Sequence, residues 1–183
     1  MEKPKATEKQ NNRRITSLET IGIDATDLAL LSRLQSQGRI KRNELAEEVG
    51  LSLPAVSERM RKLEERHILE GIHAKLDPKL MGLDVAVFIT VTVASSSNYP
   101  EFLAAATAHP EIMEVHAITG DGSHLVKART WNTSTLERLL STIQTWPGVR
   151  QTRTNVVLST IKETMALPLE ELLEGTATPP AKA

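Results

Sequence analysis

The chain has 183 residues, of which 40% are hydrophobic and 25% are charged, and its formal net charge is −1 at pH 7. The near-zero charge argues against indiscriminate coating of nucleic acid, and the lack of cysteine excludes disulfides, thiolate catalysis and cysteine-ligated zinc or iron–sulfur clusters. No apolar run reaches the roughly 18 residues of a membrane span and the N-terminus lacks the apolar core of a signal peptide, so we expect a cytoplasmic protein with no membrane contact.

A polar stretch without periodicity, residues 1–21, predicts a flexible arm at the start of the chain. Helical patterns follow over residues 24–38, 41–50 and 53–66. The first two end on a glycine, and Ser52 can cap the third. Three short helices with a tight glycine turn between the last two predict a helix-turn-helix.

The exposed side of the third helix carries the residues expected to read DNA. The N-terminal part of such a helix enters the major groove, where Ser57 and Arg61 can address base edges. Glu58 can accept from a cytosine amino group or orient a neighbouring arginine, and surrounding basic residues can meet phosphates. Arg59, near the core edge, has an acidic partner in the second helix as an equal alternative. For the whole surface, the alternative is a solvated face with Glu58 and Lys62 at i,i+4 spacing. The candidate DNA-binding set is Arg39, Lys41, Arg42, Ser52, Pro54, Ala55, Ser57, Glu58, Arg59, Arg61 and Lys62.

Beyond this motif the chain changes to β character. Residues 67–78 alternate around Gly71, which suits a short strand pair or wing. Residues 85–94 are apolar on both pleat faces, as in a strand that is covered on both sides. The next expected elements are a helix after Tyr99, strands at 112–118 and 124–130, a helix over 134–145 and a strand near 150–161, with a possible last helix at 167–173.

The order β-α-β-β-α-β of these elements is the ferredoxin-like arrangement. Its helices cover only one sheet face, so the other face is covered most simply by the same sheet of a second subunit.

A glycine-rich turn, Gly120 to His124, joins two of the predicted strands. It is not a Walker phosphate loop, because it lacks the G-K-[ST] ending and a helix directly behind it. Nor is it a nucleophile elbow, because its serine is outside G-x-S-x-G. The five histidines lack compact metal-ligand spacing, although His116 and His124 could approach each other on adjacent strands. We therefore expect no enzymatic activity, metal or cofactor. A plain hairpin turn that uses Asp-Gly for its backbone angles remains the alternative for this loop.

The segment DATDLALLSRLQSQGRIKRNELAEEVGLSLPAVSERMRKLEERHILEGIHAKLDPKLMG resembles the N-terminal half of the Lrp/AsnC (feast/famine) family of prokaryotic transcription regulators. The segments VHAITGDGSHLVKAR and PGVRQTRTNVVLSTIK are similar to the amino-acid-sensing domain of that family, which is itself ferredoxin-like. The resemblance covers roughly residues 22–162.

The resemblance implies binding to double-stranded DNA, dimerisation through the sheets and assembly into octamers or similar rings. It also implies an amino acid or related metabolite at the junctions between sensing domains. One departure is Ser123, where many members have an aspartate that can balance an ammonium group; Asp121 can compensate. Another is His124, at a position that is often aromatic. The effector set carried over by motif is Gly120, Asp121, Gly122, Ser123, His124, Thr152 and Thr154.

We therefore predict an α+β protein with an N-terminal winged helix-turn-helix followed by a ferredoxin-like βαββαβ sensing and dimerisation domain. Its expected function is sequence-specific transcription regulation in response to an amino acid or related metabolite. The alternative is an effector-independent DNA-organising protein of the same architecture. The predicted boundaries are 1–21 for the arm, 22–76 for the DNA-binding domain, 77–83 for a linker, 84–162 for the sensing domain and 163–183 for a C-terminal extension.

Overall fold

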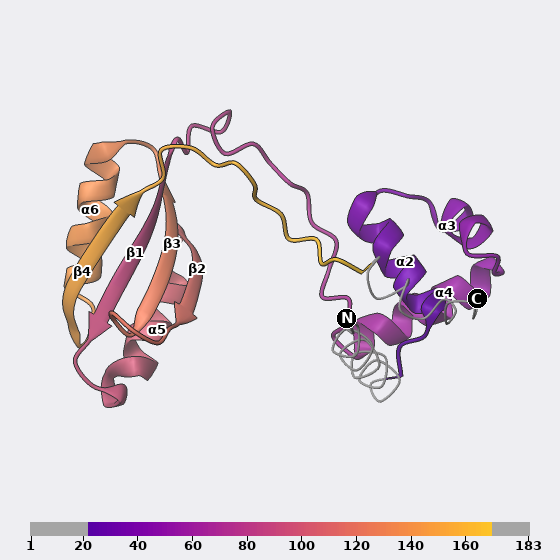
Figure 1. Cartoon of the computed structure of the whole chain (residues 1–183), viewed down its shortest axis with the longest axis horizontal. Helices are drawn as coiled ribbons and strands as arrows, with labels where there is room; N and C mark the ends of the chain where they lie inside the picture. The colour runs from indigo at the N-terminus through magenta and orange to yellow at the C-terminus, as the bar shows by residue number, and fades with distance from the viewer. Residues whose placement is uncertain (1–21, 170–183) are drawn as a thin grey trace, which may run out of the picture. The chain divides into compact units, whose positions relative to one another are not determined.

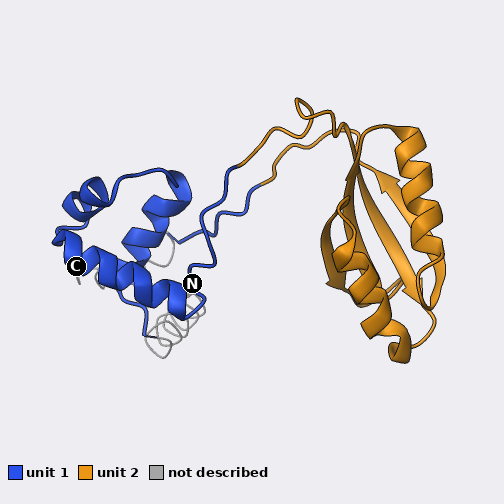
Figure 2. Cartoon of the chain, turned by 180° about the vertical axis from the view of Figure 1, so that it is seen from behind, with its two compact units in different colours: residues 1–74, 164–183 blue, residues 75–163 orange. Residues whose placement is uncertain are grey.

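A computed structural model of the chain describes residues 22–169, which form two compact units (Figures 1 and 2). The first unit holds residues 22–74 together with residues 164–169, and the second is Lys75–Glu163. The chain therefore passes between the units twice. The predicted N-terminal arm lies outside the described residues.

The first unit is built on α2 (Ala25–Ser36), α3 (Arg42–Glu48) and α4 (Leu53–Glu65), which confirms the predicted helices. The N-terminus of α2 is closed by a capping box, in which Asp24 accepts from the amide of Asp27 and Asp27 accepts from the amide of Asp24. The three helices meet in one buried cluster, made of Leu30, Leu34, Leu45, Ala46, Val56 and Met60.

The turn between α3 and α4 depends on Gly50. Its φ is +67°, in the left-handed region where a side chain is disfavoured. The Gly50 amide donates to Glu47 O at 3.2 Å and the Leu51 amide to Ala46 O at 2.9 Å, so the turn satisfies carbonyls at the end of α3. This closed turn sets the direction in which α4 leaves the motif.

The strand pair expected over residues 67–78 is wrong. These residues contain no strand or bridge, and all but Ile68, Leu69 and Pro78 are exposed. An isolated two-stranded hairpin is at best marginally stable, and Ile72 and Leu76 of this segment stay exposed and are not buried against a core. The Glu70-Gly71 step also lacks the Asn-Gly or Asp-Gly signal of a tight hairpin.

The second unit is a four-stranded antiparallel sheet in the order β2-β3-β1-β4. Along the chain its elements follow the predicted βαββαβ order, with a 3-10 turn, η1, ahead of the first helix. Their bounds are β1 Val85–Val93, η1 Ser96–Asn98, α5 Tyr99–Ala108, β2 Ile112–Ala117, β3 His124–Thr130, α6 Thr133–Gln144 and β4 Val149–Val156. The ferredoxin-like fold class is therefore confirmed.

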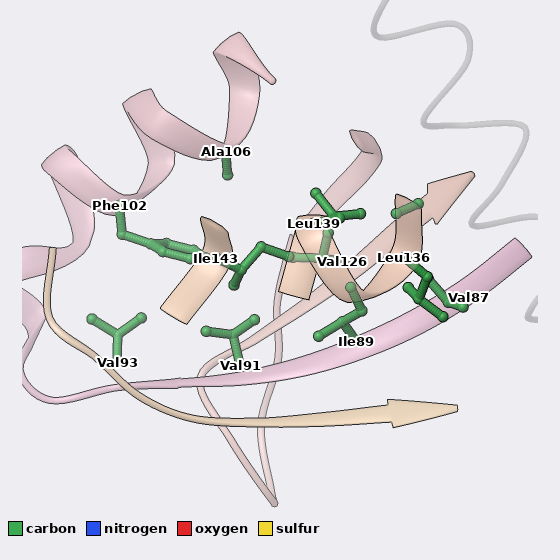
Figure 3. Packing of buried hydrophobic residues seen from close by; sticks show 11 residues of the cluster. Val87, Ile89, Val91, Val93, Phe102, Ala106, Val126, Leu136, Leu139 and Ile143 are labelled. Carbon is green, nitrogen blue, oxygen red and sulfur yellow. The ribbon is translucent and has the colours of Figure 1, made fainter. Parts of the chain in front are cut away.

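Both helices of this unit cover the same face of the sheet. Alternate residues of β1, from Val87 to Val93, point toward α5 and α6 and pack on Phe102, Leu139 and Ile143 (Figure 3). The side chains between them, such as Phe88, are only partly buried on the opposite face. We call that opposite side the open face. The cover by a second subunit predicted for it stays a prediction.

The chain after β4 differs from the sequence prediction. The strand ends at Val156, because β1 begins at Val85 and offers no longer ladder; one further bond joins the Val157 amide to Ala86 O at 2.9 Å. Residues 157–169 then form no helix or strand. The helix expected at 167–173 is absent from residues 167–169, and its remainder lies outside the described residues.

Candidate functional site

The first candidate surface is the exposed face of α4. Val56, Met60 and Leu63 are buried, which leaves the intervening positions free to face away from the unit. Pro54, Glu58, Arg61 and Lys62 are exposed, and Ala55 and Ser57 are half-buried, as the helical periodicity predicts. Arg39, Lys41 and Arg42 are exposed around the start of α3, where they remain candidates for phosphate contact.

Ser52 has a structural role at the start of α4. Its hydroxyl oxygen accepts a hydrogen bond from the amide of Ala55 at 3.4 Å, which makes it the predicted cap. The cap holds the first turn of α4 in place, and this is the turn that a helix-turn-helix presents to base edges.

Arg61 is held by two carboxylates of its own helix. Its Nε and Nη2 donate to Glu58 at 2.9 Å and 2.7 Å, and its Nη1 pairs with Glu65. The hydrogen bonds from Arg61 lower the pKa of Glu58 to about 2, so that carboxylate is ionised at neutral pH. A base or phosphate that takes Arg61 must therefore replace these carboxylates as the arginine's partner.

Arg59 has acidic partners within the motif, which favours the structural alternative to its predicted phosphate contact. Its Nη1 donates to Asp24 at 2.7 Å and to Asp27 at 2.8 Å, which joins α4 to the start of α2. Asp27 is buried, so its charge requires this partner. We assign Arg59 to the packing of the motif. These acidic partners lie at the start of the first helix, α2, whereas the alternative drawn from the sequence placed the partner in the second helix.

The second candidate surface is the loop between β2 and β3. Gly120 and Gly122 have φ values of +97° and +86°. A Cβ at Gly122 would lie 2.5 Å from Thr90 Cγ2 and 3.2 Å from Val91 O, whereas one at Gly120 would meet nothing within 4 Å. Gly122 is thus packed against β1, while Gly120 is open.

Ser123 fastens this loop to the end of β1. Its hydroxyl donates to Val91 O at 3.1 Å and accepts from the Val93 amide at 3.0 Å, and its own amide donates to Val91 O at 2.9 Å. Ser123, at the position where many proteins of the resembling family have an aspartate, therefore makes its hydrogen bonds within the protein. This leaves Asp121, whose side chain is largely exposed, as the carboxylate of the loop.

His124 lies in the core and not on the surface of the loop. Its side chain is 1% exposed, and its ring lies 4.8 Å, between centroids, from both Tyr99 and Phe102. Strand alternation places it on the helix-covered face. His116 is paired across the ladder with Leu125, so it falls on the open face and does not approach His124. We therefore remove His124 from the residues that can touch an effector at the loop.

The burial of His124 predicts a loss of stability in mild acid. Burial lowers the pKa of His124, because the imidazolium would lose its hydration between two aromatic rings. The unfolded chain then takes up this proton at a higher pH than the folded chain, so folding is favoured above a pH of about 6.5 and weakened as the pH falls below it. Guanidinium unfolding at pH 7.5 and 5.5 is expected to give a lower free energy of unfolding at pH 5.5.

The control for this prediction is a pair of variants. His124→Leu is expected to shrink the difference between the two pH values, whereas His116→Gln, at an exposed histidine, is expected to leave it unchanged. Equal differences in both variants would show that His124 is not the group responsible.

Thr152 and Thr154 are not brought to the loop within one chain. The ladder pairs them with Val91 and Ile89, whose side chains face the helices, so both threonines lie on the helix-covered side of β4. The residue between them does face the loop: Arg153 Nη1 lies 3.7 Å from Asp121 Oδ2. Sequence reasoning missed Arg153, although the period-2 alternation of β4 would have placed it opposite to the threonines.

The described residues contain no group of three histidine or acidic side chains arranged to hold a metal ion. No helix over residues 22–169 combines the length and apolar character that a membrane crossing needs.

Comparison with known proteins gives matches over both units. Residues 23–70 match the family model for winged helix-turn-helix DNA binding, and residues 86–167 match the Lrp/AsnC ligand binding domain. The HTH-type transcriptional regulator FL11 of Pyrococcus horikoshii is 35% identical over 150 residues, which cover 82% of this chain and 99% of that protein. The leucine-responsive regulatory protein of Haemophilus influenzae is 35% identical over 151 residues, 81% of this chain and 91% of that protein.

A solved structure gives the same result at the level of the fold. The transcriptional regulator NMB0573 of Neisseria meningitidis, in complex with L-methionine, superimposes with a TM-score of 0.76 at 31% sequence identity. The superposition covers 82% of this chain and 99% of that chain.

Proposed function

The chain belongs to the Lrp/AsnC family of transcriptional regulators, and on this basis we propose that it reads a specific DNA site with α4 and changes its DNA affinity when an amino acid or related small metabolite binds at the loop Gly120–Ser123. Its partner is double-stranded DNA, and it acts in the cytoplasm, where a prokaryotic chromosome lies. The relatives are named as regulators, and the same role is assigned to this chain in place of an enzymatic one.

The observation that carries the DNA-reading part is the construction of α4. It is capped by Ser52, set at an angle by the Gly50 turn and packed by Val56, while Ser57 and Arg61 lie on its outer side. A rigid helix with a short polar group in its N-terminal half and a guanidinium about one turn further along suits the major groove, where arginine pairs with guanine. The exposed basic residues near α3 supply salt-dependent phosphate contacts.

The effector part is supported by the polar groups of the loop. Within residues 22–169, the amides of Gly120, Asp121 and Gly122 enter none of the backbone hydrogen bonds, whereas the Ser123 amide does. Successive amides of this kind suit a carboxylate, and the exposed Asp121 side chain can receive an ammonium group. Among the similar proteins, one is named as leucine-responsive and another is bound to L-methionine, so we propose an amino acid with an apolar side chain.

Assembly into dimers and larger rings is part of the proposal. Leu158 and Ile161, directly after β4, are 95% and 94% exposed, and Val156 at the end of β4 is also exposed. Apolar groups left outside a core in this way mark an association surface. The open face of the sheet is the natural continuation of that surface.

The test is a titration of the full chain with single amino acids. DNA affinity is followed by fluorescence anisotropy at fixed salt, and assembly is followed by light scattering. We expect an apolar amino acid to change both, and Asp121→Asn to weaken this response. Glu101→Gln, which removes an exposed carboxylate on α5, is the matched control and is expected to respond as the unaltered chain does. If no amino acid changes either quantity, the effector-independent DNA-organising role replaces the proposal.

A further inference from the structure

The first unit holds a contact that the DNA-reading motif does not use, between α2 and the C-terminal segment. The side-chain amide of Gln35 donates to Leu167 O at 3.1 Å, and its oxygen accepts from the Leu167 amide at 2.7 Å. One side chain thus satisfies both polar groups of a single backbone residue, as a neighbouring strand would. In Figure 1 the yellow end of the described chain runs to α2.

A groove surrounds this contact. It has a volume of about 320 Å³, and α2 contributes Ser32, Gln35 and Ser36 to its lining, with residues 166–169 as the other wall. Leu169 is only 9% exposed, although Leu167 is largely exposed. Hydrogen bonds from the Ala166 amide to Thr164 Oγ1 at 3.1 Å and from the Leu169 amide to Leu167 O at 2.9 Å shape the segment locally. A hydrogen-bonded backbone residue followed by a buried leucine is the pattern of a docked peptide.

The segment is anchored on the second unit just before it reaches the groove. The carboxylate of Glu163 pairs with Lys127 and with Arg129, the latter at 3.2 Å, and Lys75 Nζ donates to Glu163 O at 3.3 Å. Lys127 and Arg129 lie on the open face, next to Phe88. The chain is therefore fixed at Glu163 within the sensing unit and at Leu167 within the DNA-binding unit, with three residues between the two anchors.

We propose that the groove of Ser32, Gln35 and Ser36 on α2 is a docking site for the chain's own segment Ala166–Leu169. Both walls of the groove belong to the first unit, so the docking is a feature of that unit alone. None of the three α2 residues is in the candidate DNA-binding set, so docking does not compete with the predicted base contacts. The proposal stands apart from the proposed effector, because it needs no ligand.

The absence of cysteine makes a direct test possible. In the full chain, Ser36→Cys combined with Pro168→Cys places two thiols on opposite walls of the groove and leaves Gln35, Leu167 and Leu169 intact. The control pair is Ala25→Cys with Pro168→Cys, which moves the first thiol about 16 Å along α2 at 1.5 Å per residue. The measurement is the rate of disulfide formation under mild oxidation, with the mass of the product determined under denaturing conditions.

We expect the groove pair to close quickly at the mass of one chain and the control pair to close slowly. Adding Gln35→Ala to the groove pair is expected to slow closure by roughly 5- to 150-fold, since two ordinary hydrogen bonds are lost. Closure no faster than in the control pair, or a product at the mass of two chains, overturns the proposal. Because neither DNA nor an amino acid is present, a failure here is distinguishable from a failure of the proposed function.

Discussion

Replacing Gly122 with valine is expected to abolish the amino-acid response and to destabilise the sensing unit. The left-handed backbone at this position costs a β-branched residue about 1–3 kcal/mol. Valine also places a Cβ 2.5 Å from Thr90 Cγ2 and 3.2 Å from the carbonyl oxygen of Val91, and the second of these is backbone that cannot turn aside. The loop must therefore leave β1, which breaks the hydrogen bonds of Ser123. Denaturant unfolding and effector titration measure the two effects.

Gly120→Val is the matched control for this variant. Its φ of +97° imposes a similar backbone strain, but the added side chain enters open space. We expect a smaller loss of stability, and the difference between the two valines isolates the contact with β1. Dimerisation, measured by sedimentation, is expected to persist in Gly122→Val. A dissociated dimer would make the loop a structural element, and an intact response would move the effector site elsewhere.

Arg61→Ala is expected to cost about 1–3 kcal/mol of binding free energy at the preferred DNA site and much less on unrelated DNA. A guanidinium that pairs with guanine contributes this discrimination only at its own base pair. The net binding free energy from Arg61 is smaller than that of the guanine contact alone, because DNA must displace Glu58 and Glu65 from Arg61. The two dissociation constants, measured at one salt concentration, give the discrimination directly.

Lys62→Ala provides the comparison on the same helix. Lys62 is exposed beside Arg61 and is predicted to meet a phosphate. Its loss is expected to weaken binding equally on all sequences and to reduce the salt dependence by about one counterion. If Arg61→Ala behaves in this same way, Arg61 is a phosphate contact and the base-reading assignment moves to Ser57.

Most of the secondary structure could be predicted from local pattern. The spacing of Leu28 and Leu34 in α2 and of Val56 and Met60 in α4 reports which helix face is buried, and each pair is buried in the fold. No strand pair forms over residues 67–78, because alternation alone cannot supply a partner strand. The longer β4 that the sequence predicts is absent for the same reason: β1 begins at Val85 and offers no partner to the residues that follow β4.

The candidate sites were predictable only in part. Exposure along α4 followed from its periodicity, but the partner of Arg59 did not, because Asp27 lies 32 residues away and reaches it only once α2 and α4 pack. At the loop, the identity of Ser123 was visible, whereas its bonds to β1 depend on a strand that is distant in the sequence. The DNA and effector assignments themselves remain predictions.

The sequence by itself determined the helix-turn-helix, the βαββαβ order and the family, because local periodicity, glycine turns and motif spacing are properties of neighbouring residues. Only the tertiary structure decided which polar groups are free to act. It buried His124, turned Thr152 and Thr154 toward the helices, brought Arg153 to Asp121 and joined Gln35 to Leu167. The physical reason is that strand register and helix packing select partners over long separations, and a side chain that is enclosed in the core, such as His124, is no longer available to a ligand.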